Sequence, residues 1–154
     1  MPPKPAAALS PVVETIDSSY LETLLGYNAR RTALAVIGVF MERMETYGLG
    51  PVDFSVISLI THNPGITSRQ LCGALSIQPP NLVGMINRFE KRGLIERRPH
   101  PHDGRAMGLY LTAEGQHMMA QAEQTATQLE ADVASHLTPA ERKTLIRLLR
   151  KVYL

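Results

Sequence analysis

The sequence predicts a mainly α-helical fold with one small β-hairpin, and three observations indicate it. Capping signals repeatedly precede stretches with apolar residues at helical spacing. Only two short stretches have the composition of strands, and the segment between them contains Pro, His and Gly. The length of 154 residues, with 44% hydrophobic and 19% charged residues, fits one soluble globular unit.

The N-terminal part of the chain is predicted to be a flexible arm followed by one long helix. Residues 1–13 hold four of the eleven prolines, so we assign residues 1–18 to an arm outside the core. Ser19 and Glu22 have the spacing of a capping box, and no proline interrupts the chain before Gly48. We expect a helix from Tyr20 to Tyr47, within a dimerisation segment at residues 19–50.

Three shorter helices are predicted next. Proline in the first turn and Asp53 near the N-terminus begin a helix from Pro51 to about Thr61. The capping pair of Thr67 and Gln70 begins a short helix that ends near Leu75. Two consecutive prolines begin a third helix, from Pro79 to Arg92, which a glycine terminates.

The remaining elements are a hairpin and two long helices. Leu94–Arg98 and Met107–Leu111 are the predicted strands. Thr112 caps a helix predicted over residues 113–135, whose apolar stripe is Met118, Ala122, Ala126, Leu129 and Val133. Thr138 and Glu141 open the final helix. We assign residues 113–154 to C-terminal dimerisation helices.

Residues 51–112 have the element order of a winged helix-turn-helix: short helices joined by a tight turn and followed by a two-stranded hairpin. In the helix after the turn, apolar and polar side chains fall on opposite faces. The apolar face is Leu82, Ile86 and Phe89, and the outer face is Asn81, Gly84 and Arg88. Such a face can enter the major groove of DNA. One amphipathic helix alone is more often a solvated surface, but the hairpin beside it favours the DNA-binding interpretation.

The positions of the charged residues along the chain, and not the net charge, indicate the kind of partner. Sixteen Lys and Arg against fourteen Asp and Glu leave a net charge of +2, too small to indicate a polyanionic partner, although the pI is about 8.9. The hairpin region concentrates the positive charge, with Arg92, Arg97, Arg98 and Arg105 against two acids, and with His100 and His102 added.

Physical roles follow for the candidate DNA contacts. The Asn81 amide can read base edges, the N-terminus at Pro79 and Pro80 can approach a phosphate, and Arg88 can bind a phosphate or a guanine. The full candidate set is Thr67, Ser68, Arg69, Gln78, Pro79, Pro80, Asn81, Gly84, Arg88, Arg98, His102, Asp103 and Arg105.

Four stretches of the chain resemble the MarR family of bacterial transcriptional regulators. They are residues 67–72, 82–98, 102–106 and 111–115, with the hairpin signature Asp103, Gly104 and Arg105 ahead of Leu-Thr-Ala-Glu-Gly. The resemblance covers about Tyr20 to Val152. It implies that Arg105 probes the minor groove while Asp103 holds it by an ion pair. Gly104 departs from the family pattern, which has a basic residue there.

The resemblance also implies a homodimer that interleaves the first helix and the last two helices of each subunit. The amount of apolar surface on these helices agrees, because a small winged domain cannot cover it. A twofold dimer would place two recognition helices about 34 Å apart on a pseudo-palindromic operator.

Family members commonly release DNA when a small anionic or phenolic compound binds between the dimerisation helices and the winged domain. We therefore expect a repressor released by a small aromatic carboxylate, with an aromatic acyl-CoA as the alternative effector. The candidate ligand residues are Tyr27, Asn28, Arg30, Arg31, Met44, Phe54 and His62. The competing interpretation is that Arg30 and Arg31 are solvated or pair with glutamates across the dimer.

Other functional classes are weakly supported. The sequence has no Gly-x-Ser-x-Gly and no Walker-type loop, so we expect neither an enzyme nor a cofactor. Cys72 is the only cysteine and is expected in the core rather than as an oxidant sensor. His100, His102 and Asp103 form the only compact candidate metal cluster, but DNA contact is their simpler role, and no metal is expected. A winged-helix module that binds proteins instead of DNA stays an alternative.

Membrane and export interpretations are not favoured. The longest apolar run, Ala33–Met41, is too short to cross a bilayer, and the N-terminus lacks the pattern of a secretory signal. A single cysteine suits a reducing compartment, so the expected location is the cytoplasm.

Overall fold

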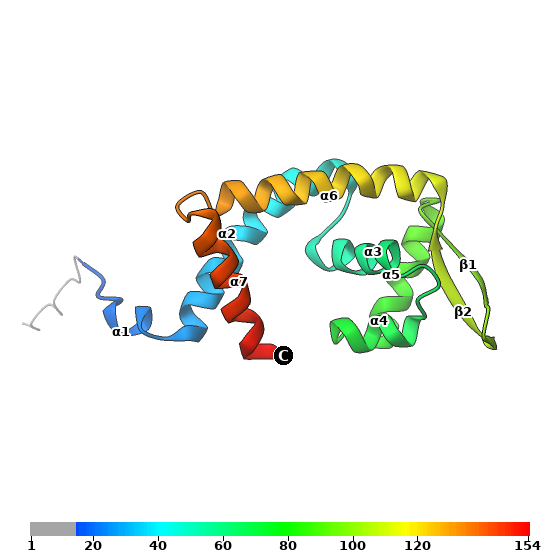
Figure 1. The fold of residues 1–154 in the computed structure, drawn as a ribbon, viewed down its shortest axis with the longest axis horizontal. Coiled ribbons are helices and arrows are strands. Elements are labelled where there is room, and N and C mark those ends of the chain that lie inside the picture. Colours follow the sequence, from blue (N-terminus) through cyan, green and yellow to red (C-terminus); the bar gives the residue numbers. More distant parts are fainter. Residues whose placement is uncertain (1–14) are drawn as a thin grey trace, which may run out of the picture. The chain divides into compact units, whose positions relative to one another are not determined.

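The computed structural model describes residues 15–154, so most of the predicted arm at residues 1–18 lies outside the described residues. The chain divides into two compact units, one ending at Leu34 and one running from Ala35 to Leu154. The boundary falls within helix α2 (Leu25–Met44) (Figure 1).

The predicted single long helix is wrong, because the chain breaks after α1 (Ser19–Glu22) and resumes at α2. At the break, the Asn28 amide donates hydrogen bonds to the carbonyl oxygens of Glu22 and Leu24, both at 2.8 Å. The side chain thus satisfies the Glu22 carbonyl, which a continuous helix would pair with a backbone N–H group, whereas the Leu24 carbonyl also accepts from the Asn28 N–H at 3.1 Å. The expected Ser19 cap is also displaced: Ser18 precedes the helix, and the Asp17 carboxylate accepts from the Ser19 N–H.

The helices of the second unit begin where their capping residues predict. After α2, a single 3₁₀ turn (Glu45–Tyr47) ends at Gly48, whose φ of 61° suits a residue without a Cβ. Helix α3 (Pro51–His62) starts with proline, and its Asp53 carboxylate accepts from the Gly50 N–H at 3.2 Å. Helix α4 (Ser68–Leu75) carries the predicted capping box. Helix α5 (Pro79–Lys91) follows a tight turn.

The hairpin is longer than predicted. Strand β1 (Ile95–His100) pairs antiparallel with β2 (Asp103–Leu111), and the register shifts between Pro99 and His100. We expected Pro99 to end the first strand, but proline is tolerated in an edge strand because its missing N–H can face away from the partner. The tip is therefore reduced to Pro101 and His102.

Helix α6 (Ala113–Val133) packs its N-terminal part directly on the winged region. The Thr112 N–H donates to the Leu94 carbonyl, and a Cβ built on Gly115 would lie 2.0 Å from that same carbonyl oxygen. Of the predicted stripe, Ala122 and Leu129 are buried, whereas Met118, Ala126 and Val133 are half-buried. Met119 is fully buried instead, so the packed face is rotated slightly from the predicted one.

One hydrophobic core joins α3, α4, α5, the hairpin and α6. Its fully buried larger side chains are Met44, Val56, Ile57, Ile60, Leu71, Leu82, Ile86, Phe89, Leu109, Met119 and Leu129. Cys72 is half-buried and packs against this core, as expected from its apolar neighbours.

Helix α7 (Pro139–Tyr153) contrasts with the others, because none of its residues is buried. Its predicted capping box of Thr138 and Glu141 is present. Exposed apolar side chains include Leu145, Ile146, Leu148 and Val152. No helix in the described range 15–154 is long and apolar enough to span a membrane.

Candidate nucleic-acid interface and effector pocket

Helix α5 presents the outward face that the sequence predicts. Leu82, Met85, Ile86 and Phe89 are buried. Asn81, Gly84 and Arg88 are exposed, and a Cβ on Gly84 would meet nothing within 4 Å. The hydrophobic side anchors the helix in the core, so the opposite side is free to approach a large partner.

The N-terminus of α5 has fewer free N–H groups to bind a phosphate than the sequence predicts. Pro79 and Pro80 have no N–H, and the N–H groups of Asn81 and Leu82 both donate to the Gln78 carbonyl. None of these first backbone groups is therefore free to bind a phosphate oxygen. Any attraction at this end must come from the helix dipole and from side chains.

Helix α4 begins with exposed polar side chains. Thr67 is occupied by the capping box, because its hydroxyl accepts from the Gln70 N–H at 3.3 Å and its own N–H donates to Gln70 Oε1. Ser68 and Arg69 are exposed. Among the predicted backbone contacts at this helix, Ser68 and Arg69 are thus the available groups.

Two arginines of the interface region tie elements together. Arg88 Nη2 lies 2.8 Å from Asp53 Oδ1, which joins α5 to α3. Arg97 Nη2 lies 2.8 Å from Asn87 Oδ1 and 2.9 Å from Glu90 Oε2, which joins the hairpin to α5. These pairs orient the hairpin and the helix, although each is partly exposed and individually weak.

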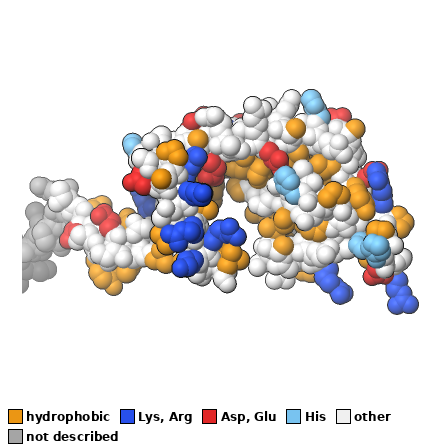
Figure 2. Space-filling view, viewed as in Figure 1, with side chains coloured by type: hydrophobic (Ala, Val, Ile, Leu, Met, Phe, Trp, Pro, Cys, Tyr) orange, Lys and Arg blue, Asp and Glu red, His pale blue; other side chains and the backbone are white. Residues whose placement is uncertain are grey.

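At the tip of the hairpin, the Arg105 side chain has no ion-pair partner among residues 15–154. Asp103 Oδ1 accepts from the backbone N–H of Arg105 at 3.0 Å, and no ion pair joins these two side chains in the described part of the chain. The ion pair implied by the family resemblance is thus replaced by a backbone contact. Arg98, in contrast, pairs with Glu96 and stacks 4.9 Å from the Tyr110 ring centroid. Basic side chains project at the hairpin end (Figure 2).

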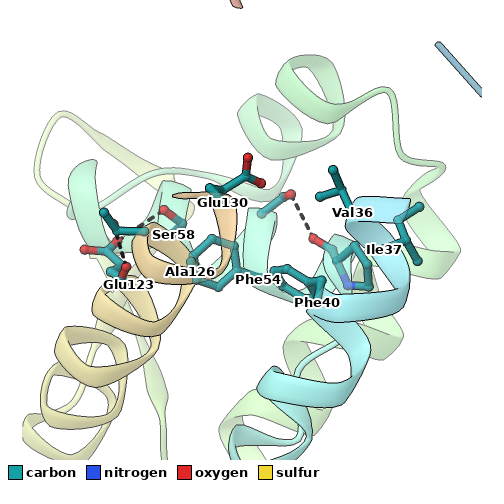
Figure 3. A pocket seen from close by; sticks show the side chains of 11 residues that line it. Val36, Ile37, Phe40, Phe54, Ser58, Glu123, Ala126 and Glu130 are labelled. Carbon is teal, nitrogen blue, oxygen red and sulfur yellow. Dashed lines mark hydrogen bonds between the residues drawn. The ribbon is translucent and has the colours of Figure 1, made fainter. Parts of the chain in front are cut away.

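A separate cavity of about 520 Å³ lies within the second unit, between α2, α3 and α6. Phe40 and Phe54 form one wall, with ring centroids 5.6 Å apart at an interplanar angle of 72°. Figure 3 shows Glu123 and Glu130 on α6 among the lining residues and Ser58 directed toward Glu123. The lining residues are Val36, Ile37, Phe40, Pro51, Phe54, Ser55, Ser58, Glu123, Ala126, Thr127 and Glu130.

Comparison with known proteins identifies the family. A family model described as "MarR family" matches residues 47–106. A putative transcriptional regulatory protein for the hcr operon of Thauera aromatica is 32% identical over 130 residues, which is 84% of this chain and 78% of that protein. The chain belongs to the MarR family. It is a winged helix-turn-helix transcriptional regulator, and the family is not one of enzymes.

Two solved structures of one MarR-family relative superpose on the chain. The transcriptional repressor CouR bound to a 23-mer DNA duplex has a TM-score of 0.84 and 32% identity, covering 92% of this chain and all of that one. CouR bound to p-coumaroyl-CoA has a TM-score of 0.76 and 32% identity, covering 90% of this chain and 97% of that one. The mainly helical fold with a hairpin wing is thereby confirmed.

The predicted ligand residues are divided between the two units of this MarR-family chain. Only Phe54 lines the cavity, Met44 is fully buried in the core, and His62 contacts the lining residue Glu123. The other four, Tyr27, Asn28, Arg30 and Arg31, belong to the first unit, where the Asn28 amide caps the break after α1.

Most of the residues that line the cavity were not predicted from the sequence. Glu123, Thr127 and Glu130 lie at helical spacing along α6, and Ser55 and Ser58 lie among apolar residues on α3. Polar residues beside an otherwise apolar stripe are the signal that could mark them, although none of these polar side chains is buried.

Proposed function

We propose that this MarR-family chain represses transcription as a homodimer bound to a pseudo-palindromic operator and that an aromatic effector releases it. The proposal depends on the exposed outer face of α5. This face lies next to a hairpin whose Arg105 side chain has no ion-pair partner in the part of the chain that the structure describes. A helix with a polar edge and a small residue fits the major groove, and an arginine at a hairpin tip fits the minor groove.

The predicted DNA contacts differ in whether their side chains are already held in ion pairs within the protein. Asn81, Arg69 and Arg105 are exposed and can reach DNA without breaking an ion pair seen here. Arg88 and Arg98 must compete with Asp53 and Glu96 for their guanidinium groups. We assign base reading to Asn81, minor-groove contact to Arg105, and backbone contact to Ser68 and Arg69.

Dimerisation accounts for the uncovered apolar side chains of α7. Ile146 is 52% exposed and Val152 is 65% exposed on a helix with no buried residue. A second copy of the chain is the expected cover, because paired terminal helices bury such surfaces reciprocally in a twofold dimer. The solved CouR repressor on DNA supports the operator part of the proposal.

We assign the aromatic effector to the cavity between α2, α3 and α6. Its walls are largely apolar and include two phenylalanines, which suits a planar ring. The relative CouR binds p-coumaroyl-CoA, which supports an aromatic acyl thioester as the alternative to a free aromatic acid.

Arg105→Ala tests the DNA-binding part. We expect weaker binding to the operator with an unchanged oligomeric state, measured by fluorescence anisotropy beside size-exclusion chromatography. Arg105→Lys keeps the charge but loses the planar fork, so it should recover only part of the affinity. Binding of the parent protein should weaken steeply with added salt, with a slope that reflects several phosphate contacts. Unchanged affinity of Arg105→Ala would refute the hairpin assignment, and the absence of salt-dependent DNA binding would favour a protein-interaction module.

A further inference from the structure

A short linker at residues 45–50 joins the C-terminal half of α2 to α3, and all of it belongs to the second unit (Figure 1). Within this linker, the carbonyl oxygens of Tyr47 and Gly48 both accept hydrogen bonds from the Arg92 guanidinium, with Nη1 at 3.1 Å from the Gly48 oxygen. A planar guanidinium can hold two neighbouring acceptors in a fixed geometry. Arg92 therefore fastens the end of α5 to the linker.

The backbone of Arg92 is itself fixed by the way α5 ends. The Gly93 N–H donates to the Glu90 carbonyl at 2.9 Å, and the Leu94 N–H donates to the Phe89 carbonyl at 3.0 Å. This is the Schellman pattern, and Gly93 has the positive φ of 72° that the pattern requires. The Arg92 side chain thus reaches the linker from a rigid helix end.

A second contact fastens the other end of the linker to α5. The Asp53 carboxylate accepts from the Gly50 N–H through Oδ2 and from Arg88 through Oδ1. Arg88 and Arg92 are four residues apart, so their side chains leave neighbouring positions on one face of α5. Arg88 can exchange Asp53 for DNA, whereas the Arg92 guanidinium is used by the linker carbonyls. Arg92 is therefore the arginine that can hold the linker while α5 lies on DNA.

The C-terminal half of α2 is joined in turn to α6. The Tyr47 hydroxyl lies 2.9 Å from Thr125 Oγ1, and Arg43 forms an ion pair with Asp132. Helices α2 and α6 supply part of the proposed dimer. Through Tyr47, the Arg92 hydrogen bonds thus connect α5 to the helices that are expected to hold the two copies together.

We infer that Arg92 is a positioning residue that sets the spacing of the two α5 helices in the homodimer, rather than a DNA contact. The inference rests on the proposed homodimer and operator. Two half-sites in one duplex have a defined separation, so a pair of α5 helices selects that separation only if each helix is restrained within its own subunit. Without the Arg92 hydrogen bonds, α5 should keep its outer face but take a wider range of positions relative to α2.

Operator spacing tests the inference. The full-length parent protein first selects a preferred duplex from random-sequence DNA. Derivatives of this duplex then lose or gain one central base pair, which moves one half-site by about 3.4 Å and turns it by about 34°. We expect the parent to bind each derivative at least about tenfold more weakly, since deforming the duplex to restore the spacing costs free energy of that order.

Arg92→Met keeps the aliphatic stem of the side chain and removes its donors. Arg92 is exposed, so this change should not unfold the core. The variant should bind the preferred duplex about tenfold more weakly, because binding must then order α5 without the lost hydrogen bonds. Its preference for the selected spacing over the derivatives should shrink to about threefold or less.

A duplex with a single half-site separates positioning from direct contact. Arg92→Met should bind it within about twofold of the parent, because the outer face of α5 is unchanged. Lys91→Ala removes a neighbouring exposed charge at the same helix end and is the matched control, which should keep the parental spacing preference. Arg92→Lys restores a donor without the planar fork, so it should recover part of that preference.

A measurement without DNA tests the same contact. Spin labels at Glu42→Cys on α2 and Gly84→Cys on α5, in a Cys72→Ser background, report the distance between these helices by pulsed electron resonance. Excess unlabelled protein limits the signal to pairs within one chain. Glu42 is exposed, and a Cβ on Gly84 would meet nothing within 4 Å. The distance distribution should be broader in Arg92→Met than in the parent, and Lys91→Ala should leave it unchanged.

The two measurements can contradict the inference separately. An unchanged distance distribution in Arg92→Met would overturn it, whether or not the protein binds DNA. An equal loss on the single half-site and on every spacing would make Arg92 a DNA contact or a folding determinant, and a parental spacing preference in Arg92→Met would likewise overturn it. If the parent selects no duplex, the proposed operator binding fails, and the spin-label distances alone decide whether Arg92 positions α5.

Discussion

Gly115 illustrates how one residue joins two parts of the winged region. Its missing side chain allows the first turn of α6 to approach the Leu94 backbone, where a Cβ would lie 2.0 Å from the carbonyl oxygen. The obstacle is backbone that is also bonded to the Thr112 N–H, so it cannot move aside without breaking the start of α6. Glycine is thus required there by space rather than by backbone dihedral angles.

Gly115→Ala should therefore destabilise the protein by about 3 kcal/mol, the upper range for forced overpacking. Urea unfolding followed by circular dichroism measures the change at a fixed protein concentration. Gly73→Ala is the control, because a Cβ there would meet nothing within 4 Å and alanine favours the helix by about 1 kcal/mol. Equal stability of the two variants would show that the contact at Leu94 relaxes easily.

Asn81 is the residue on which sequence reading by α5 is expected to depend. It is exposed at the start of the helix, and its amide can both donate to and accept from a base edge. Asn81→Ala should lower the discrimination between cognate and mismatched operators by roughly 1 to 3 kcal/mol. Anisotropy titrations on a set of single-base operator variants measure this. A uniform loss on all sequences would make Asn81 a backbone contact.

At the scale of single elements, α7 depends on its cap because it has no buried residue. The Thr138 N–H and hydroxyl donate to the Glu141 carboxylate, and these contacts lower the pKa of Glu141 from its ordinary value of 4.5. The backbone hydrogen bond is the larger cause and the hydroxyl is the second. A carboxylate with a lowered pKa stabilises the helix end at neutral pH and loses that contribution as the pH falls through its folded-state pKa.

The first turn of α7 should consequently loosen when the pH falls below the ordinary pKa of Glu141. Its stability should not change between about pH 6 and about pH 8, because carboxyl groups ordinarily titrate below that range. Amide exchange at residues 138–142, followed by NMR, measures it. Glu141→Gln forms the same capping contacts without a titrating group, so its first turn should respond less to pH. An identical response in both proteins would assign the effect to another carboxyl group.

At the scale of the whole molecule, the apolar face of α7 connects the fold to the proposed dimer. Leu148 is 48% exposed in the described chain, although it stands in an amphipathic pattern that normally faces a partner. Lys and Arg side chains gather over α7 beside these apolar groups (Figure 2). A second copy of the chain would cover the apolar side chains of α7 in the proposed dimer.

Leu148→Glu should weaken the homodimer by at least about tenfold in dissociation constant, because it forces a charge into the apolar contact. Sedimentation velocity over a concentration series measures the dissociation constant. Met107→Glu is the control, since Met107 is similarly exposed at 46% but lies on the hairpin. A Leu148→Glu protein that dimerises as the parent does would remove α7 from the interface.

Local signals were sufficient for most of the fold and for part of the candidate DNA interface. Capping boxes at Thr67 and Thr138 and the first-turn prolines predicted the starts of α3, α4, α5 and α7, because these contacts join residues close in sequence. The amphipathic pattern of α5 likewise predicted its buried and exposed faces. The break after α1 was missed, since it depends on a specific hydrogen bond from Asn28 that no periodicity indicates.

The sequence by itself determined the order of the elements from α3 onward, the family resemblance and the outward face of α5, all of which depend on near neighbours in the chain. Only the tertiary structure decided that Arg88 pairs with Asp53, that Asp103 contacts backbone, and that Glu123 and Glu130 line a cavity with Phe40 and Phe54. These contacts join residues far apart in sequence, so burial and hydrogen-bond partners become known only when the helices pack.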